Sequence, residues 1–131
     1  MNITQETQVN LIELGEVSRR MSLNSGISIS TPVSVSDQSF AVCLSDVSFG
    51  DIAPRDSILV VEPEADATQA RFSLVDVNGQ PQMLKVKSKN GKYFAAKVSE
   101  SNTKWSELDS NITIHGAIVH IKRPALGYHC I

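Results

Sequence analysis

The sequence lacks the features that would place the chain in a membrane or outside the cell. It has no apolar run long enough to span a bilayer. Residues 1–6 show neither the basic nor the apolar region of a signal peptide. We therefore expect a cytoplasmic protein without a membrane partner. The formal net charge is −2, which gives no basic footprint for autonomous DNA binding.

Cysteine is scarce, and no metal motif is present. Cys43 and Cys130 are the two cysteines, and their spacing does not match a motif such as C-x-x-C. Cys43 lies in an apolar segment and is expected to be a small buried hydrophobic residue, whereas Cys130 is expected to be exposed or disordered. We expect no disulfide in a reducing compartment. His115 and His120 lack Asp, Glu or Cys at metal spacing, so we predict no metal and no cofactor.

The residues that are abundant indicate a β-rich domain. The 131 residues are 41% hydrophobic and 20% charged, which suits a single globular domain with a sizeable core. Asn78-Gly79 and Asn90-Gly91 each separate two segments of strand character, and Asn-Gly supplies the positive φ angles of two-residue hairpin turns. The apolar runs 40–44 and 58–61 predict buried strands. A further strand is expected over residues 112–122.

The first 38 residues give weaker signals. Residues 5–24 fit a helical face and a strand almost equally well, an ambiguity that short apolar segments often leave. Residues 22–38 are rich in serine, which is typical of a connector. Within them, apolar residues alternate with polar ones as in a half-buried strand, at Ile27, Ile29, Val33 and Val35. Pro32 interrupts this pattern and favours an edge strand or a bent one.

The order of the motifs resembles that of the LexA-like peptidases, which include SOS repressors, lambda-type phage repressors and the UmuD proteins. The motifs are a serine loop at 45–52, a core strand, a lysine-bearing hairpin, Asn102-x-x-Trp105 and a terminal strand with a central glycine. The resemblance covers about residues 40–122, with weaker support over 14–19. It implies a mostly β fold, with a strongly bent antiparallel sheet or partial barrel of the LexA C-terminal domain type.

The resemblance also implies a division of the chain. Residues 1–38 would be an N-terminal arm and connector with a degenerate cleavage site. Residues 39–123 would be the peptidase and dimerisation domain, and residues 124–131 a tail. Trp105 is expected to be a packing anchor, and the terminal strand is expected to offer a free edge for pairing.

Ser48 and Lys85 are the candidate catalytic residues. In the family, a serine attacks a peptide bond of its own chain and a lysine on a later strand takes the serine's proton, at about the interval that separates these two residues. Serine is a weak nucleophile until a base removes its proton. Lysine is a base only when neutral, which burial favours, and Ser–Lys pairs are a known variant of the catalytic triad. Phe49 and Met83 are expected to flank this pair.

A plainer interpretation of the same residues stays open. Serine and lysine are abundant in this chain, so that a Ser–Lys pair at a chosen spacing is unremarkable. Strand alternation puts Lys85 on the face opposite Leu84 and Val86, and on that interpretation Lys85 is a solvated side chain, as Lys87 is expected to be.

The expected cleavage region departs from the family pattern. The resemblance favours an extended segment over residues 14–20 that leads to a dipeptide at Arg19-Arg20, where the family has Ala-Gly or Cys-Gly. Two long cationic side chains fit poorly where two small residues are usual. Leu14-Gly15 and Ser25-Gly26 are other X-Gly bonds in the region. We therefore expect self-cleavage to be lost or conditional.

These observations favour a regulatory and oligomerisation domain of a phage-type, LexA/CI-like transcriptional repressor. The alternatives are an active Ser–Lys autopeptidase of the SOS response and an UmuD-like polymerase accessory protein, which the length and the strand carrying His120 suit. The expected partners are a second copy of the chain and a RecA-type filament, an antirepressor or a polymerase. DNA would be bound only through a helix-turn-helix domain, for which the residues before Ser48 are too few. We expect either that this part was removed or that the protein is naturally short.

Overall fold

The computed structural model describes residues 7–22, 26–98, 104–109 and 112–124. They form nine strands and one 3-10 helix, η1, in the order β1 (Thr7–Glu13), η1 (Leu14–Ser22), β2 (Ser28–Thr31), β3 (Phe40–Cys43), β4 (Ile58–Glu62), β5 (Phe72–Val77), β6 (Gln80–Lys89), β7 (Lys92–Lys97), β8 (Ser106–Glu107) and β9 (Thr113–Lys122). The strands make one mixed sheet in the order β2-β1-β3-β4-β9-β5-β6-β7-β8. The prediction of a mostly β protein is confirmed.

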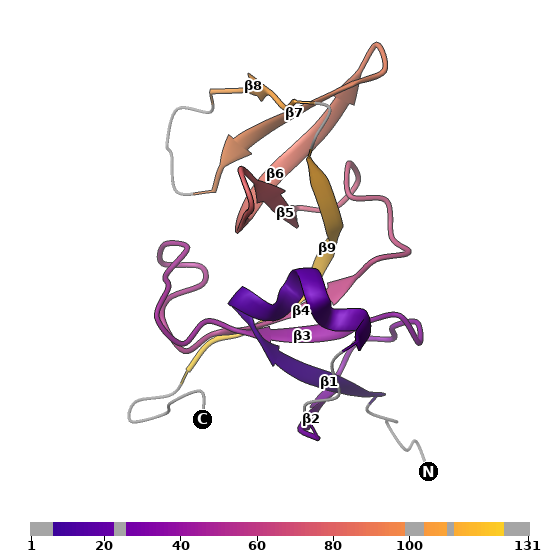
Figure 1. Ribbon diagram of the computed structural model, residues 1–131, viewed down its shortest axis with the longest axis vertical. Helices are drawn as coiled ribbons and strands as arrows, with labels where there is room; N and C mark the ends of the chain where they lie inside the picture. Colours follow the sequence, from indigo (N-terminus) through magenta and orange to yellow (C-terminus); the bar gives the residue numbers. More distant parts are fainter. Residues whose placement is uncertain (1–6, 23–25, 99–103, 110–111, 125–131) are drawn as a thin grey trace.

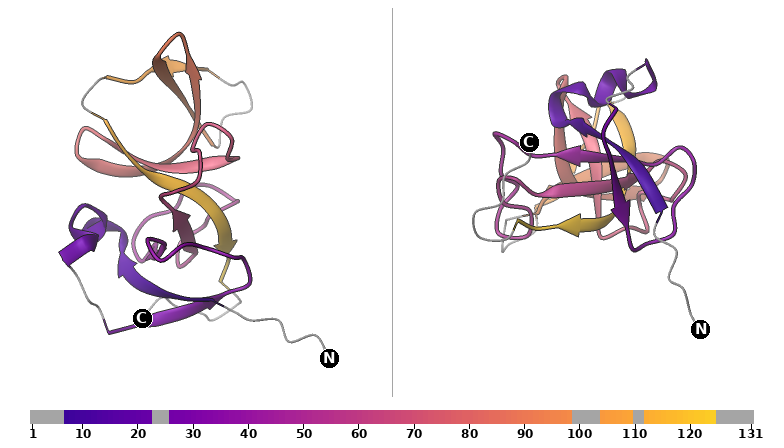
Figure 2. Two further views of the ribbon diagram at one scale, coloured as in Figure 1. Left: turned by 90° about the vertical axis from the view of Figure 1, so that its right-hand side faces the viewer. Right: turned by 90° about the horizontal axis from the view of Figure 1, so that it is seen from below.

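Strand β9 joins the two halves of the sheet. It pairs antiparallel with β4 through its C-terminal part and with β5 through its N-terminal part. Figures 1 and 2 show β9 running from the strands β5–β8 down to the layer of β1–β4. The expectation that the terminal strand offers a free edge is therefore wrong, because the edge strands of the described sheet are β2 and β8. Pairing of β1 with β3 is parallel, so the sheet is not purely antiparallel.

Two irregularities allow β9 to bend between these halves. Its register shifts against β4 between Val60 and Val61, and against β5 between Leu74 and Val75. Such bulges bend a strand and increase its twist. Gly116 lies on β9 between the two places where the register shifts. Its φ is 155°, and a Cβ atom there would lie 2.8 Å from the backbone C and O of Glu62. The central glycine of the terminal strand therefore permits a backbone contact that a side chain would block.

The main core lies between the two halves and is built largely from the predicted apolar strands. All four residues of β3 are buried, and the first four of β4 are at most 1% exposed. The largest cluster also takes side chains from η1, β5, β6 and β9, including Leu14, Val17, Phe72, Leu74, Met83 and Ile118. A separate cluster of Val75, Leu84, Val86 and Ala95 stabilises the β5–β7 end. Burial of apolar area in these clusters is the main force that stabilises the fold.

Both predicted hairpins are confirmed. Asn78 and Asn90 each have a φ of 53°, and the glycine that follows is also at positive φ in each turn. Two consecutive positive φ angles define the tight turn that matches strand twist. The turns set the registers Val77↔Gln80 and Lys89↔Lys92.

The N-terminal segment differs from the expectation of an extended chain over residues 14–20. After β1 the backbone turns into η1 at Leu14. Leu14 and Val17 lie three residues apart, a spacing that puts them on one side of a 3-10 helix, and they are 9% and 0% exposed. The helical conformation is favoured because it buries both side chains against the main core.

The serine-rich connector contains a shorter strand than its pattern suggests. Strand β2 pairs with β1 at the sheet edge and ends at Thr31, directly before Pro32, which confirms the edge-strand prediction. The rest of the connector is held by Glu62, whose carboxylate accepts hydrogen bonds from Ser36 N at 2.6 Å and Ser36 Oγ at 2.7 Å. Burial acts to raise the pKa of Glu62, but the hydrogen bonds from Ser36 and Glu64 outweigh it, so this pKa lies below its ordinary value of 4.5.

Cys43 corrects another expectation. Its side chain is fully buried, as predicted, but it is disulfide-bonded, contrary to the expectation of a free thiol. The other cysteine of the sequence, Cys130, lies outside the described residues.

Among the residues that the structure describes, no helix has the length and apolar character that crossing a membrane requires.

Candidate functional site

The loop that carries Ser48 connects β3 to β4 and is closed at its base. Leu44 N donates to Ser57 O at 3.0 Å, and Asp56 N donates to Leu44 O at 2.7 Å. Asp56 has a φ of 68°, a conformation that Asp tolerates better than most residues. The loop therefore leaves and re-enters the sheet at a fixed point.

A tight turn follows Ser48 and fixes the tip of this loop. Phe49 N donates to Ala53 O at 2.8 Å, and Ala53 N donates to Gly50 O at 3.2 Å. Ala53 is fully buried, and Phe49 and Ile52 pack against the main core. These apolar contacts hold the turn in place, while Ser48 itself is exposed. Ser48 Oγ accepts a hydrogen bond from Gly50 N at 3.2 Å, which orients the hydroxyl oxygen towards the turn.

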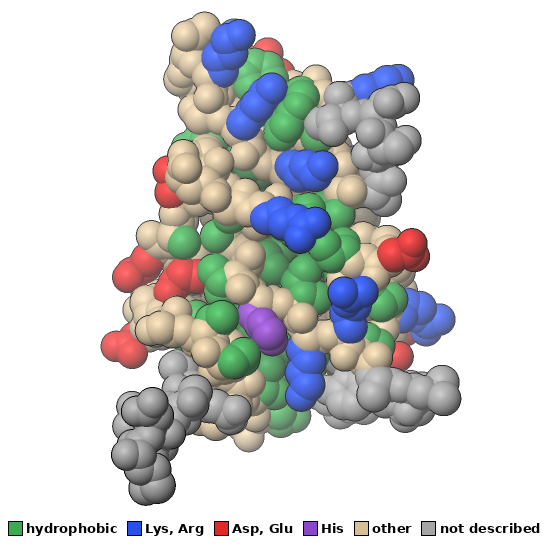
Figure 3. Space-filling model, turned by 180° about the vertical axis from the view of Figure 1, so that it is seen from behind, with side chains coloured by type: hydrophobic (Ala, Val, Ile, Leu, Met, Phe, Trp, Pro, Cys, Tyr) green, Lys and Arg blue, Asp and Glu red, His purple; other side chains and the backbone are tan. Residues whose placement is uncertain are grey.

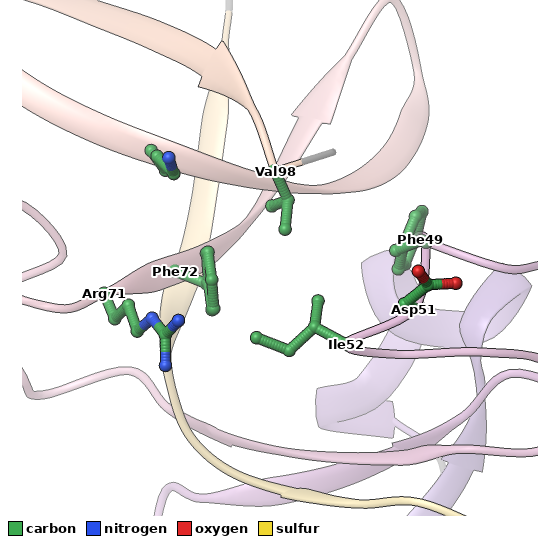
Figure 4. A pocket seen from close by; sticks show the side chains of 8 residues that line it. Phe49, Asp51, Ile52, Arg71, Phe72 and Val98 are labelled. Carbon is green, nitrogen blue, oxygen red and sulfur yellow. The ribbon is translucent and has the colours of Figure 1, made fainter. Parts of the chain in front are cut away.

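Lys85 projects from β6 into a hollow beside this turn. Its cross-strand neighbour is Ala96, which is too small to cover it, and Lys85 is half-buried. The hollow has a volume of about 340 Å³ and is lined by Phe49, Gly50, Asp51, Ile52, Arg71, Phe72, Lys85 and Val98. Figure 4 shows the apolar side chains of Phe49, Ile52, Phe72 and Val98 around this space, with Arg71 and Asp51 on opposite sides.

Ser48 lines a second, smaller hollow that adjoins the first. Its volume is about 160 Å³, and its walls are Ser48, Phe49, Gly50, Gln82, Met83, Leu84, Lys97 and Val98. Phe49, Gly50 and Val98 belong to both hollows. The structure therefore brings the Ser48 loop and the Lys85 strand to one region, although no hydrogen bond joins these two side chains within the described part of the chain.

The two expected flanking residues lie in this region. Phe49 lines both hollows, and Met83 lines the hollow of Ser48 while being only 3% exposed. Lys97 was missed by sequence reasoning, although it lines the hollow of Ser48 and is exposed. The register of the Asn90-Gly91 turn predicts that Lys97 pairs with Leu84, as it does. This pairing was the sequence signal that could have placed Lys97 near Met83 and Lys85.

The candidate cleavage residues lie on η1 and at its start. Leu14 and Gly15 line a groove of about 460 Å³ that shares Phe49 and Gln82 with the hollow of Ser48. Arg19 is exposed on η1, and its guanidinium lies 3.8 Å from the carboxylate of Glu16. The backbone of Arg20 belongs to η1. The candidate scissile bonds are therefore held in helical structure and are not presented as an extended strand. Ser25-Gly26 begins at a residue outside the described ranges.

A polar cluster that includes the buried His115 links η1 to the sheet. His115 Nε2 is 2.9 Å from Asp76 Oδ1, and the His115 side chain is 2% exposed. Ser18 Oγ donates to Asp76 Oδ2 at 3.1 Å. Because the carboxylate stands between the serine and the histidine, this order does not place a base on the Ser18 hydroxyl, as a catalytic triad requires. The cluster anchors η1 to β5 and β9.

Trp105 differs from its expected role as a packing anchor. It is 37% exposed, and Lys87 Nζ lies 4.2 Å from the centre of its ring. Asn102, which begins the Asn-x-x-aromatic element, lies outside the described residues.

Within the described ranges, no group of three or more His, Cys, Asp or Glu residues could hold a metal ion.

Comparison with known proteins does not assign the chain to a family. No family model matches the sequence, and no curated protein matches it.

Proposed function

We propose that this chain is the regulatory and oligomerisation domain of a phage-type, LexA/CI-like transcriptional repressor whose self-cleavage is lost or conditional. The finer fold that this proposal implies is the bent sheet or partial barrel of the LexA C-terminal domain. The observation that supports it best is the meeting of the Ser48 loop and the Lys85 strand around Phe49, Gly50 and Val98. Ser48 and Lys85 lie on separate segments of the chain, and each lines one of the two adjoining hollows.

Conditional cleavage follows from the state of η1 in this proposal. Cleavage in the family scheme needs an extended scissile segment, whereas Leu14-Gly15 and Arg19-Arg20 lie in a 3-10 helix. Val17, which is fully buried, and the Ser18–Asp76 hydrogen bond both oppose opening of this helix. Local unfolding of such a segment costs free energy, so that a partner that binds the opened form would promote cleavage.

The oligomerisation function can be tested with a fusion protein. The chain would be placed after a monomeric helix-turn-helix domain, and a reporter would carry two half-sites one helical turn apart. We expect the fusion to repress the reporter and the helix-turn-helix domain alone to fail, because linking two DNA-binding modules raises their effective concentration. Light scattering after size exclusion should give a dimer or a larger species. A monomeric mass at tens of micromolar together with no repression would contradict the proposal.

An active Ser–Lys autopeptidase is the second candidate. It is favoured by the two lysines, Lys85 and Lys97, that line the hollows beside the Ser48 loop. A general base must come within hydrogen-bond reach of the proton that it takes, and such contacts often tighten only in the reacting complex. The third interpretation, an UmuD-like polymerase accessory protein, stays a prediction.

A further inference from the structure

Positive charge is concentrated in one part of this weakly acidic chain. From residue 77 to residue 99 the sequence has no Asp or Glu, and it has five lysines, Lys85, Lys87, Lys89, Lys92 and Lys97. The chain as a whole has a net charge of −2. A run of this kind on a folded hairpin creates a local positive field even when the net charge is negative.

Four of these lysines lie on one face of the β6–β7 hairpin. Lys85, Lys87 and Lys89 occupy alternate positions of β6, which point to the same side of a strand. Lys92 pairs directly with Lys89 across the turn and joins this face. Successive lysines of β6 are spaced by about 6.6 Å along the strand, since a strand rises by about 3.3 Å per residue. Figure 3 shows Lys and Arg side chains, with hydrophobic side chains between them, down one side of the molecule.

Aromatic side chains interleave with the lysines on this face. Phe94 is half-buried opposite Lys87. The ring of Trp105 lies under Lys87 Nζ at 4.2 Å and is 37% exposed, so it belongs to the same face. Two acidic residues, Glu107 and Asp109, lie at this edge beside Lys92, and Glu107 lies 3.4 Å from Lys92 Nζ and is partly neutralised by it. The face thus combines a row of cations with an accessible indole ring.

This combination fits a single-stranded nucleic acid better than the other polyanions. Lysines in a row can follow a phosphate backbone as point charges, without reading base edges. An exposed aromatic ring lets bases stack, which contributes binding for any base. Duplex DNA hides its base faces and is read by elements that enter a groove, while an acidic peptide would use the lysines and leave the indole without a stacking partner.

We propose that the face of β6–β8 that carries Lys85, Lys87, Lys89, Phe94 and Trp105 binds single-stranded nucleic acid without strong sequence preference. This role is independent of the repressor function, and it would add a contact with nucleic acid to the DNA binding that is expected through a separate domain. The ammonium group of Lys87 lies over the indole ring. Arg71 adds a further cation in the hollow of Lys85, which Asp51 also lines.

The test uses the full chain and an oligothymidylate of about 16 nucleotides, the upper end of the site sizes of sheet-based single-strand binders. Trp105 is the only tryptophan of the chain, so base stacking can be followed directly as quenching of its fluorescence. We expect saturable quenching and a rise in the anisotropy of a labelled oligonucleotide at about 50 mM salt, with weaker binding at about 200 mM. A duplex of the same length and polyglutamate are the competing ligands.

Variants distinguish stacking from charge. Trp105→Ala should weaken binding by about fivefold or more. Lys87→Gln with Lys89→Gln should weaken it and flatten the slope of log affinity against log salt by about 1.4, since each phosphate contact contributes about 0.7. Lys122→Gln, an exposed lysine on β9, is the matched control and should change little.

Four results would overturn the proposal. They are the absence of saturable binding at low salt, equal or tighter binding of polyglutamate or of the duplex, an effect of Lys122→Gln as large as that of the double variant, and full affinity in Trp105→Ala. The altered side chains are exposed, and matching far-UV circular dichroism spectra and melting curves would show that each variant is folded.

Discussion

Replacing Gly116 by alanine should weaken the joint between the two halves of the sheet. A Cβ atom at this position would lie 2.8 Å from the backbone C and O of Glu62 and 2.9 Å from the Cα of Pro63. These are backbone atoms of a paired strand end, which cannot rotate away as a side chain can. The φ of 155° is also a conformation that residues with a side chain rarely adopt.

The expected magnitude follows from these two effects. Forcing an extra methyl into a packed region costs about 1–3 kcal/mol, and holding a residue other than glycine in a sparsely populated backbone conformation costs about 1–3 kcal/mol. We expect Gly116→Ala to lower the free energy of unfolding by about 4 kcal/mol. For a chain of this size that corresponds to a fall in Tm of about 15 °C. Urea unfolding followed by far-UV circular dichroism, at one fixed protein concentration, measures the change.

Two other glycines are matched controls that separate the two effects. Gly15 has no atom within 4 Å of a built Cβ and no positive φ, so Gly15→Ala should change stability by less than about 0.5 kcal/mol. Gly91 also has open space but a φ of 75°, so Gly91→Ala should cost about 1 kcal/mol from conformation alone. If Gly116→Ala costs no more than Gly91→Ala, the steric part of this reasoning is refuted.

Three further predictions concern charge and chemistry. The lowered pKa of Glu62 means that its hydrogen bonds stabilise the fold above the ordinary carboxyl value of 4.5, and that this contribution is lost as the pH falls through the lower folded value. Glu62→Gln should therefore make unfolding measured by circular dichroism less sensitive to acid below about pH 4.5, and an unchanged acid profile would count against it. His115→Ala should lower the free energy of unfolding by about 2–4 kcal/mol, because it empties a buried site and removes the contact with Asp76; a loss below about 0.5 kcal/mol in urea unfolding would contradict this. The chain should not cut itself at neutral pH. Replacing Arg19-Arg20 by Ala-Gly and incubating at about pH 9–10, where an ordinary lysine begins to lose its proton, should give slow cleavage seen by mass spectrometry. Ser48→Ala and Lys85→Ala should each abolish the cut, while persistence of cleavage in Ser48→Ala would show that another residue is the nucleophile.

Local signals were sufficient for most of the strands. Each Asn-Gly pair needs two positive φ angles and so specifies a hairpin and its register without help from the rest of the chain. The runs 40–44 and 58–61 are apolar on both faces, and the structure buries both faces of β3 and β4. These elements could be predicted because the residues that determine them are adjacent in sequence.

Long-range packing decided the features that were predicted wrongly. The segment after Glu13 is too short and too mixed for its periodicity to favour one conformation, and η1 forms because Val17 finds a fully buried place on the main core. The position of β9 between β4 and β5 depends on the pairing of strands that lie far apart in sequence. The exposure of Trp105 likewise reflects its place directly before the edge strand β8. None of these properties has a local signature.

A local sequence signal and long-range packing together determine which lysines lie beside the Ser48 loop. The Asn90-Gly91 turn pairs Lys89 with Lys92, and neither of these lysines lines the two hollows beside the loop. Residues 82–85 in the middle of β6 and Lys97 at the end of β7 line the hollows beside the loop, so the lysines at this place are Lys85 and Lys97. The register could have been predicted from the turn alone. The position of the loop could not, because Phe49 and Ile52 are held by a core that several distant strands build together. A base for Ser48, where one acts, should therefore come from the open end of this hairpin, and the lysines near its turn remain available to bind anions.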